Sequence, residues 1–146
     1  MTSYDPGNVF ARILRGELPC EKIYEDAHSF AFMDIMPRAD GHALVIPKHP
    51  ARTFLDLPQE EIGPLYGTVQ LVARAARQAF AADGLTIQQF NESAGGQVVF
   101  HMHVHVLPRR EGAALLPPTT AMAAKEVLAA HGAKLREAIA SLAGPR

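Results

Sequence analysis

The stretch Val99-Phe100-His101-Met102-His103-Val104-His105-Val106-Leu107-Pro108 carries three histidines, one at every second position. Alternation of polar and apolar residues with a period of two predicts a β-strand, whose successive side chains point to opposite faces. We therefore expect a strand over 99–107, ended by Pro108, with the three histidines on one face. At a rise of about 3.3 Å per residue, their imidazoles would stand roughly 6.6 Å apart, close enough to serve one site.

Three interpretations of this histidine row are open. It could be structural, although each neutral ring has a donor and an acceptor that need partners. It could bind a divalent metal, but no Cys-x-x-Cys, His-Glu-x-x-His or nearby acidic residue completes a ligand set, and three ligands from one strand would strain tetrahedral geometry. The third interpretation is nucleophilic attack on phosphorus, because a nitrogen–phosphorus intermediate splits one difficult displacement into two easier ones. We favour the third, and expect neither a metal nor a cofactor.

Composition sets modest limits. The 146 residues, 48% of them hydrophobic, suit one domain over 1–146. The formal net charge is −1 with both signs mixed along the chain, which favours neither a nucleic-acid groove nor a membrane surface. The single Cys20 allows no internal disulfide, and no apolar run has the length of a signal-peptide core or a membrane span. We expect a cytoplasmic protein without nucleic-acid or membrane partners.

The remaining pattern predicts an α+β fold with an antiparallel sheet of about five strands, two long helices and a short N-terminal helix. Apolar residues at helical spacing, with Pro58 near the start and Gly84 just past the end, predict a long helix over 58–83. The other expected helices cover 9–14 and 120–142, the latter within a helical tail over 119–143, and the other expected strands cover 22–25, 28–33, 43–46 and 85–90.

Several separated motifs occur in one order along residues 8–110. They are Val9-Phe10-x-x-Ile13-x-x-Gly16-x-x-Pro19, Tyr24-Glu25-Asp26, Ala31-Phe32-x-Asp34-Ile35-x-Pro37, Gly41-His42-x-Leu44-Val45-Ile46-Pro47-Lys48, Asn91, Gly96-Gln97 and the His-φ-His-φ-His-φ-φ segment from His101 to Leu107. This series resembles the histidine triad family of nucleotide hydrolases and transferases, in its branch of histidine triad nucleotide-binding proteins and their bacterial relatives. The resemblance implies a homodimer with a continuous sheet, in which the long helix after Pro58 lies at the interface.

The resemblance also implies roles for the histidines. His103 would attack the α-phosphorus, and His101 would orient and polarise it, with His42 joining as the fourth histidine. His105 and the backbone of Gln97, Val98 and Val99 would hold phosphate oxygens.

The rest of the implied site would bind the nucleoside. Asp34 would take the ribose hydroxyls, although it could also serve only as a turn residue. Asn91 would contact a phosphate oxygen or simply end a strand. The base pocket would be walled by apolar residues that would equally suit a plain core, namely Val9, Phe10, Phe32, Ile35 and Leu44.

The resulting expectation is cleavage at the α-phosphate of a purine nucleoside phosphoramidate or a related nucleotide, through a covalent nucleotidyl-histidine intermediate. Three alternatives remain. The first is a dinucleoside polyphosphate hydrolase, which needs room for two nucleosides. The second is a nucleotide-binding adaptor with little turnover. The third is a metal-dependent hydrolase, whose activity a chelator would remove.

Overall fold

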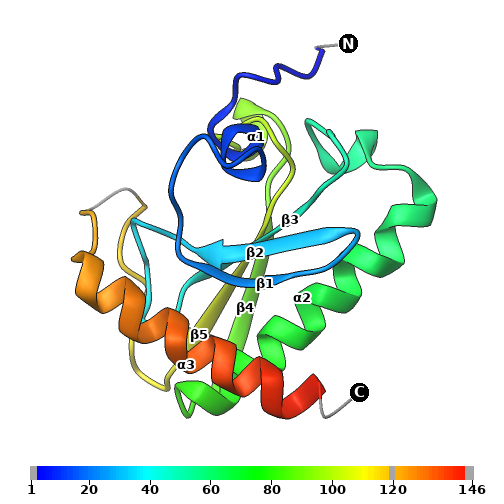
Figure 1. The fold of residues 1–146 in the computed structure, drawn as a ribbon. Coiled ribbons are helices and arrows are strands. Elements are labelled where there is room, and N and C mark those ends of the chain that lie inside the picture. The colour runs from blue at the N-terminus through cyan, green and yellow to red at the C-terminus, as the bar shows by residue number, and fades with distance from the viewer. Residues whose placement is uncertain (1–2, 119–120, 144–146) are drawn as a thin grey trace.

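The computed structural model describes residues 3–118 and 121–143 (Figure 1). Three α-helices, five strands and two short 3-10 helices follow one another in this described part of the chain. Their bounds are α1 Val9–Leu14, β1 Lys22–Glu25, β2 Ser29–Met33, β3 Ala43–Pro47, η1 Phe54–Asp56, α2 Gln59–Ala79, β4 Gly84–Gln89, η2 Ser93–Gly95, β5 Val104–Arg109 and α3 Lys125–Ala143. The expected α+β class is confirmed, with a short N-terminal helix and two long helices.

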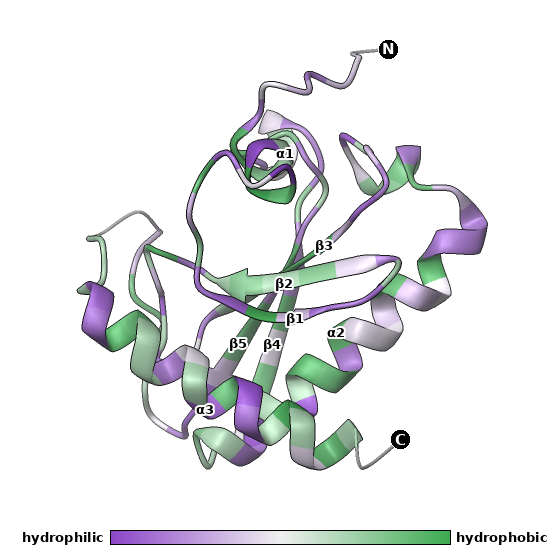
Figure 2. Ribbon diagram, in the orientation of Figure 1, coloured by the Kyte–Doolittle hydropathy of each residue, from purple (hydrophilic) through white to green (hydrophobic). Residues whose placement is uncertain are grey.

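The strands form one antiparallel sheet in the order β1-β2-β3-β5-β4. β1 and β2 are the predicted hairpin, whose turn is held by Asp26: its carboxylate accepts from the backbone amides of His28 and Ser29. β2 and β3 are buried along their whole length, as interior strands covered on both faces are. Figure 2 shows β2 as predominantly hydrophobic.

Alternate residues of the central strands divide between two apolar clusters. Ala31 and Val45 belong to the larger cluster, which also contains residues of α2 and α3, so the two long helices cover that face of the sheet. Phe32 and Leu44 belong to a smaller cluster with Phe10 of α1, so the short helix covers part of the other face. In Figure 2 both long helices carry hydrophobic and hydrophilic residues, as helices covering one face of a sheet do. No helix in the described part of the chain is long and apolar enough to cross a membrane.

The predicted strand over 99–107 is wrong in its extent. β5 begins only at Val104, whose partners are Gln89 at the end of β4 and Val45 of β3. Residues before Val104 have no pairing partner in β4, because β4 ends at Gln89. Of the three histidines in this stretch, only His105 therefore lies within β5. His101 and His103 lie in the segment just before the strand.

Pro108 does not end this strand, which continues to Arg109. Proline lacks a backbone N–H, so it fits a strand only where one side of the ladder is unpaired. β3 pairs with β5 only as far as Val106, and Pro108 pairs with Leu85 of β4 alone. The sequence shows the proline but not where the second neighbour stops.

The helix ends also differ from the prediction. α2 ends at Ala79 rather than at 83, because Ala81 takes a left-handed φ of 47° and turns the chain into β4. α3 begins at Lys125, and the predicted start at Thr120 lies outside the described residues. Just before α3, the backbone amide of Ala123 donates to the Ile35 carbonyl at 2.9 Å, which ties this segment to the β2–β3 loop and delays the helix.

Candidate functional site

Four histidines gather on the α1 face of the sheet. His42 closes the loop before β3, and its partner strand β5 places His105 opposite Leu44, so both lie beside the smaller apolar cluster. His101 and His103 come from the approach to β5. All four side chains have low exposure: three are fully buried and His105 is partly buried. The residues came from two separated motifs in the sequence, and the fold brings them together.

His101 has its tautomer set by two partners. Its Nε2 atom lies 2.8 Å from the Pro47 carbonyl oxygen, which only accepts, so Nε2 carries the proton and donates. Its Nδ1 atom therefore accepts a hydrogen bond from the hydroxyl of Tyr4 at 2.6 Å. The two partners hold the ring from opposite sides, and His101 has no free nitrogen for chemistry.

His103 is held by a backbone oxygen. Its Nδ1 atom lies 2.7 Å from the carbonyl oxygen of His101, so Nδ1 carries the proton and donates. In the neutral ring the lone pair then belongs to Nε2, for which the described residues offer no hydrogen-bond partner. Phe10 packs its ring at right angles to the imidazole, with centroids 4.9 Å apart. His103 is therefore a fixed, neutral imidazole with one free basic nitrogen.

His42 and His105 form a relay of hydrogen bonds. The backbone amide of Arg38 donates to Nδ1 of His42 at 3.1 Å, so the His42 proton sits on Nε2. That Nε2–H donates to Nδ1 of His105 at 2.9 Å. Nδ1 of His105 therefore has no proton, and its Nε2–H remains as a donor. The rings of His103 and His105 have centroids 5.1 Å apart, so the relay ends on the ring next to His103.

Burial keeps all four rings neutral at pH 7. Desolvation lowers the pKa of His42 and of His101 to about 4, and that of His105 to about 3. It also lowers the pKa of His103, opposed by the hydrogen bond to the His101 carbonyl, which favours the protonated ring. Neutral rings are what the tautomers above require.

Asp34 lies beside the relay, at the end of β2. One carboxylate oxygen accepts from the backbone amide of Met36 at 2.8 Å, and the other lies 3.4 Å from Nε2 of His42. Because His42 is neutral, the second contact is polar rather than an ion pair. Burial raises the pKa of Asp34.

Asp34, His42 and His105 are also the one group with the spacing of metal ligands that is found among the described residues, with their ligand atoms within 4.8 Å of one another. Sequence spacing does not show this group as a possible ligand set, because Asp34 follows β2, His42 precedes β3 and His105 lies in β5. A metal needs a lone pair on each histidine nitrogen. The amide of Arg38 points at Nδ1 of His42 and keeps the proton on Nε2, so the observed tautomer favours the hydrogen-bonded relay over metal binding.

The expected base-pocket residues divide into two kinds. Phe10, Phe32 and Leu44 are buried in the smaller apolar cluster, and Phe10 meets Phe32 edge to face with ring centroids 5.3 Å apart. Val9 and Ile35 remain about half exposed, at 48% and 47%. Phe10, Phe32 and Leu44 thus form the apolar packing beside the histidines. Val9 and Ile35 are exposed enough to contact a ligand.

The expected phosphate-holding residues lie in the segment before His101. Gln97 is buried, and its side chain makes hydrogen bonds within the protein. Its Oε1 atom accepts from the Glu92 amide, and its Nε2 atom donates to the carbonyl oxygens of Arg52 and Val99. By contrast, the backbone amides of Val98 and Val99 donate to no other described residue. The backbone here is thus open to a ligand, whereas the Gln97 side chain holds the turn together.

The side chain of Asn91 makes hydrogen bonds to two other residues of the protein. Its Oδ1 atom accepts from the Phe54 amide at 2.8 Å and from the Gln89 side chain at 2.9 Å, and its Nδ2 atom donates back to Gln89. This network explains the asparagine as a structural residue between β4 and the 3-10 helix η1. The Nδ2 group has a second N–H, so the expected contact with a phosphate oxygen stays a prediction.

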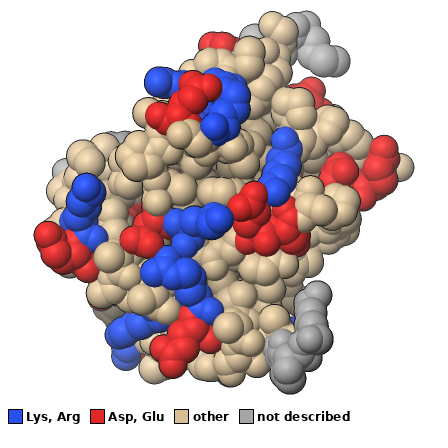
Figure 3. Space-filling model, viewed as in Figure 1, with Lys and Arg blue, Asp and Glu red and all other residues tan. Residues whose placement is uncertain are grey.

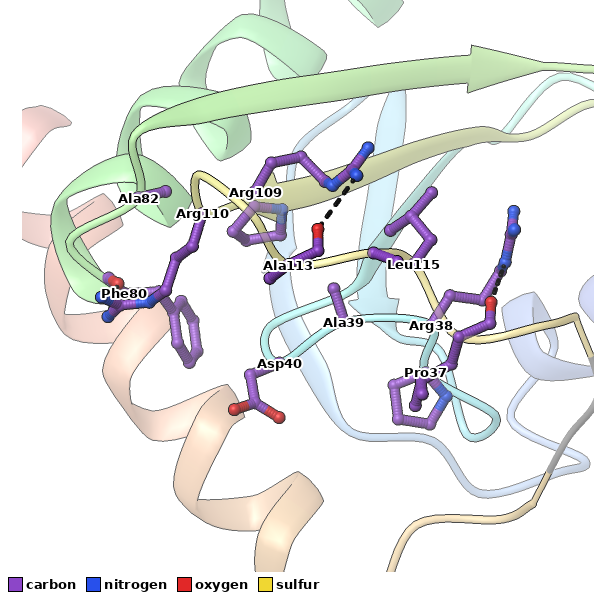
Figure 4. Close-up of a pocket in the computed structure, with 13 residues that line it drawn as sticks. Pro37, Arg38, Ala39, Asp40, Phe80, Ala82, Arg109, Arg110, Ala113 and Leu115 are labelled. Atoms are coloured by element: carbon purple, nitrogen blue, oxygen red, sulfur yellow. Dashed lines mark hydrogen bonds between the residues drawn. The ribbon is translucent and has the colours of Figure 1, made fainter.

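An open cavity of about 300 Å³ lies elsewhere, between the loop before β3, the turn after α2 and the chain that follows β5 (Figure 4). Arg38 is a lining residue, and its guanidinium donates to the Leu116 carbonyl at 2.7 Å. None of the four site histidines lines this cavity. The cavity is therefore separate from the histidine site, although the amide of Arg38 reaches His42.

Charge does not mark a binding face on the side shown in Figure 3, where basic and acidic side chains lie next to one another. This mixing agrees with the formal net charge of −1. The chemical signal lies in the buried histidines instead.

Comparison with known proteins is consistent across sequence and structure. The family model described as HIT domain matches residues 15–112. The chain is 38% identical over 103 residues to adenylylsulfatase HINT3 of Arabidopsis thaliana, a match that spans 70% of this chain and only 52% of that protein. It is 34% identical over 107 residues to adenosine 5'-monophosphoramidase HNT1 of Saccharomyces cerevisiae, which spans 73% of this chain and 65% of the yeast protein.

Among solved structures, a Hit-like protein from Bartonella henselae, described as involved in cell-cycle regulation, superposes with a TM-score of 0.90 at 45% identity. The superposition covers 94% of this chain and 99% of that one. The similarity therefore includes the C-terminal helix as well as the motif-bearing part.

Proposed function

Because the chain belongs to the HIT domain family, we propose that it is a nucleotide hydrolase or transferase that cleaves a purine nucleoside phosphoramidate, or a related nucleotide, at the α-phosphate. One observation carries the proposal: Nδ1 of buried His103 donates to the His101 carbonyl, which leaves Nε2 as a free nucleophile. A surface histidine would lack both the fixed tautomer and the partly dry surroundings.

In the proposed reaction, Nε2 of His103 attacks the α-phosphorus. A nitrogen–phosphorus bond forms, the bond from phosphorus to the leaving amine breaks, and the amine takes a proton from solvent as it departs. The positive charge that develops on the imidazole is stabilised by its hydrogen bond to the His101 carbonyl. Water then attacks the phosphorus and loses a proton to solvent, the phosphorus–nitrogen bond to His103 breaks, and the nucleotide leaves as the monophosphate. The two displacements restore the neutral ring.

Negative charge on the phosphoryl oxygens needs fixed donors at low dielectric. The Nε2–H of His105 supplies one, because the relay from Arg38 through His42 keeps the proton at that nitrogen. The unpaired amides of Val98 and Val99 supply others. In this proposal His42, which the family resemblance implies as the fourth histidine, acts on the substrate through His105.

The nucleoside would lie on the α1 face. Asp34 would accept from the ribose hydroxyls, and the base would rest on Val9 and Ile35 above the buried Phe10, Phe32 and Leu44. The names of the Arabidopsis and yeast relatives, adenylylsulfatase and adenosine 5'-monophosphoramidase, support an adenylyl group as the part that binds.

The test is product formation from adenosine 5'-phosphoramidate by the wild type and by His103→Ala. The proposal expects AMP release by the wild type and a loss of at least ~10³-fold in the variant. Turnover that survives the substitution contradicts it. Diadenosine tetraphosphate offered in parallel decides whether the leaving group is an amine or a phosphate, and a chelator arm separates this chemistry from a metal-dependent hydrolase.

We also propose a homodimer in which two β4 strands pair. β4 is an edge strand, and no described element occupies its outer side. Ile87 in this strand is 44% exposed, which is unusual for a large apolar side chain on an open edge. Pairing of two edges would join the sheets and cover both.

A further inference from the structure

Arg52 lies between β3 and η1 and makes several contacts with the turn over 92–99, which precedes the three clustered histidines of 101–105. Its guanidinium makes two hydrogen bonds to the Glu92 carboxylate, both at 2.9 Å. The same guanidinium lies over the ring of Phe100, 4.2 Å from the centroid, which is a cation–π contact. Its carbonyl oxygen accepts from the buried side chain of Gln97 at 2.7 Å. One arginine therefore contacts Glu92 at the start of the turn, Gln97 within it and Phe100 just after it.

Glu92 has a backbone conformation that side chains rarely adopt. Its φ is +62° and its ψ is 165°, a region that is open to glycine and strained for residues with a Cβ. Strain of this kind persists only where the surroundings hold it in place. The backbone of Glu92 is held by Gln97, because the Glu92 amide donates to the Gln97 side chain and the Gln97 amide donates back to the Glu92 carbonyl.

The strained residue sets the course of the backbone toward the site. Residues 93–96 and Val98 of this turn are exposed and Gln97 is buried, so few packing contacts define the path of the turn. Its two unpaired amides, at Val98 and Val99, are the donors that the proposed reaction uses. A change in the Glu92 backbone would redirect those amides without touching a histidine.

We propose that Arg52 is a positioning residue, which holds Glu92 in its strained conformation and thereby aims the Val98 and Val99 amides at the phosphoryl oxygens. This inference rests on the proposed function for its effect on turnover, but its effect on the turn does not. The side chain of Arg52 is 15% exposed and that of Glu92 is 47% exposed, so the pair lies at the surface where both can be replaced without opening the core.

A double-mutant cycle tests whether Arg52 holds Glu92 in its strained conformation, an interaction that we call the Arg52–Glu92 clamp. Arg52→Ala is expected to lower kcat for adenosine 5'-phosphoramidate about tenfold with KM changed less than threefold, because the amides act mainly on charge that grows in the transition state. Glu92→Gly removes the strained side chain, and we expect its kcat within threefold of the wild type. Glycine needs no clamp at this backbone conformation, so adding Arg52→Ala to Glu92→Gly should cost less than threefold.

A substrate-free readout accompanies the kinetics. Hydrogen exchange of the amides at positions 92 and 97 should be at least tenfold faster in Arg52→Ala than in the wild type. In the double variant it should be less than threefold faster than in Glu92→Gly alone. Arg136→Ala is the matched control, because Arg136 of α3 makes a surface ion pair at 2.7 Å with Glu21, the residue just before β1. This variant should change neither the kinetics nor the exchange.

Two results overturn the inference. In one, Arg52→Ala keeps wild-type exchange in the turn. In the other, it loses activity to the same extent with and without Glu92→Gly, which would mean that the arginine acts by charge rather than by holding strain. If the wild type turns over no nucleotide, the proposed function fails separately, and the exchange cycle alone decides whether Arg52 clamps the turn.

Discussion

Nε2 of His42 lies 2.9 Å from Nδ1 of His105, although 63 residues separate them in the chain. The backbone amide of Arg38 on the far side of His42 gives this contact a direction, because it leaves only Nε2 of His42 to carry the proton. The relay therefore presents Nε2–H of His105 to the site. The tautomer of His105, which would contact the substrate in the proposed reaction, is therefore set by the main-chain amide of Arg38, with His42 between them.

Loss of the relay should slow the chemistry while leaving the nucleophile in place. In His42→Ala, Nδ1 of His105 loses its donor, and the proton is no longer confined to Nε2. We expect kcat to fall roughly tenfold to a hundredfold, less than the 10²–10³-fold typical of deleting a transition-state donor outright. His28→Ala changes an exposed histidine paired with Glu61 and serves as the control. Equal activity of the two variants in steady-state assays would show that the relay has no catalytic role.

The buried histidines make stability depend on pH. The pKa values of His42 and His101 are about 4 and that of His105 about 3 in the folded protein, against an ordinary value near 6.5. Between these values the unfolded chain binds more protons, so the unfolding free energy falls as pH falls below about 6.5. The raised pKa of Asp34 acts in the opposite direction, but it is one group against these three, and burial also lowers the pKa of His103.

The expected size is a loss of ~2 kcal/mol or more between pH 7 and pH 5, since each proton contributes about 1.4 kcal/mol per pH unit. Urea titrations followed by circular dichroism at both pH values measure it. His42→Asn should weaken the dependence by removing one of the three groups. An unfolding free energy that is the same at both pH values would contradict the burial of neutral rings.

Gly41, next to His42, should not tolerate a side chain. Its φ is +83°, and a Cβ there would lie 2.5 Å from the Phe80 ring. Gly16 has a similar φ of +78° but no atom within 4 Å of the corresponding position. We expect Gly16→Ala to cost about 1 kcal/mol from backbone strain alone, and Gly41→Ala to cost about 2 kcal/mol more through the clash. Thermal melts of the two variants compare them directly, and equal melting temperatures would argue against the tight approach of Phe80.

A charge on the open edge of β4 should prevent pairing of two chains. Ile87→Lys is expected to shift the protein from dimer to monomer in sedimentation velocity, because a buried lysine across a joined sheet would lack a partner. Val127→Lys on α3 replaces an apolar residue with the same exposed fraction of 44% and should leave the dimer intact. A monomeric wild type, or a dimer that tolerates Ile87→Lys, would contradict the β4 interface.

Most of the fold could be predicted from local patterns, because hydrophobic periodicity over long segments is a strong signal. The strand predicted over 99–107 nevertheless begins too early, because β5 starts only at Val104. A period of two shows which residues alternate, but it does not show where the neighbouring strands stop. β4 leaves the ladder at Gln89, and His101 and His103 lie beyond that point. Hydrogen bonds orient these rings instead: His101 bonds to Pro47 and Tyr4, and His103 bonds to the His101 carbonyl.

The partners of the histidines were less predictable than the histidines themselves. The sequence singled out all four rings. It gave no signal for Tyr4, which contacts a ring 97 residues away, or for the amide of Arg38, since a main-chain donor has no side-chain signature. The positive φ of Glu92 was also hidden, because glycine is the usual marker of such a conformation and glutamate occupies the position.

The most direct measurement is mass spectrometry of the protein quenched under alkaline conditions during turnover of adenosine 5'-phosphoramidate. Alkali is needed because a nitrogen–phosphorus bond to histidine is labile in acid. We predict a nucleotidyl adduct on the peptide containing His103 in the wild type, with release of AMP, and neither in His103→Ala. AMP formed by the wild type without an adduct at any time point, or by His103→Ala at the wild-type rate, would contradict attack by His103.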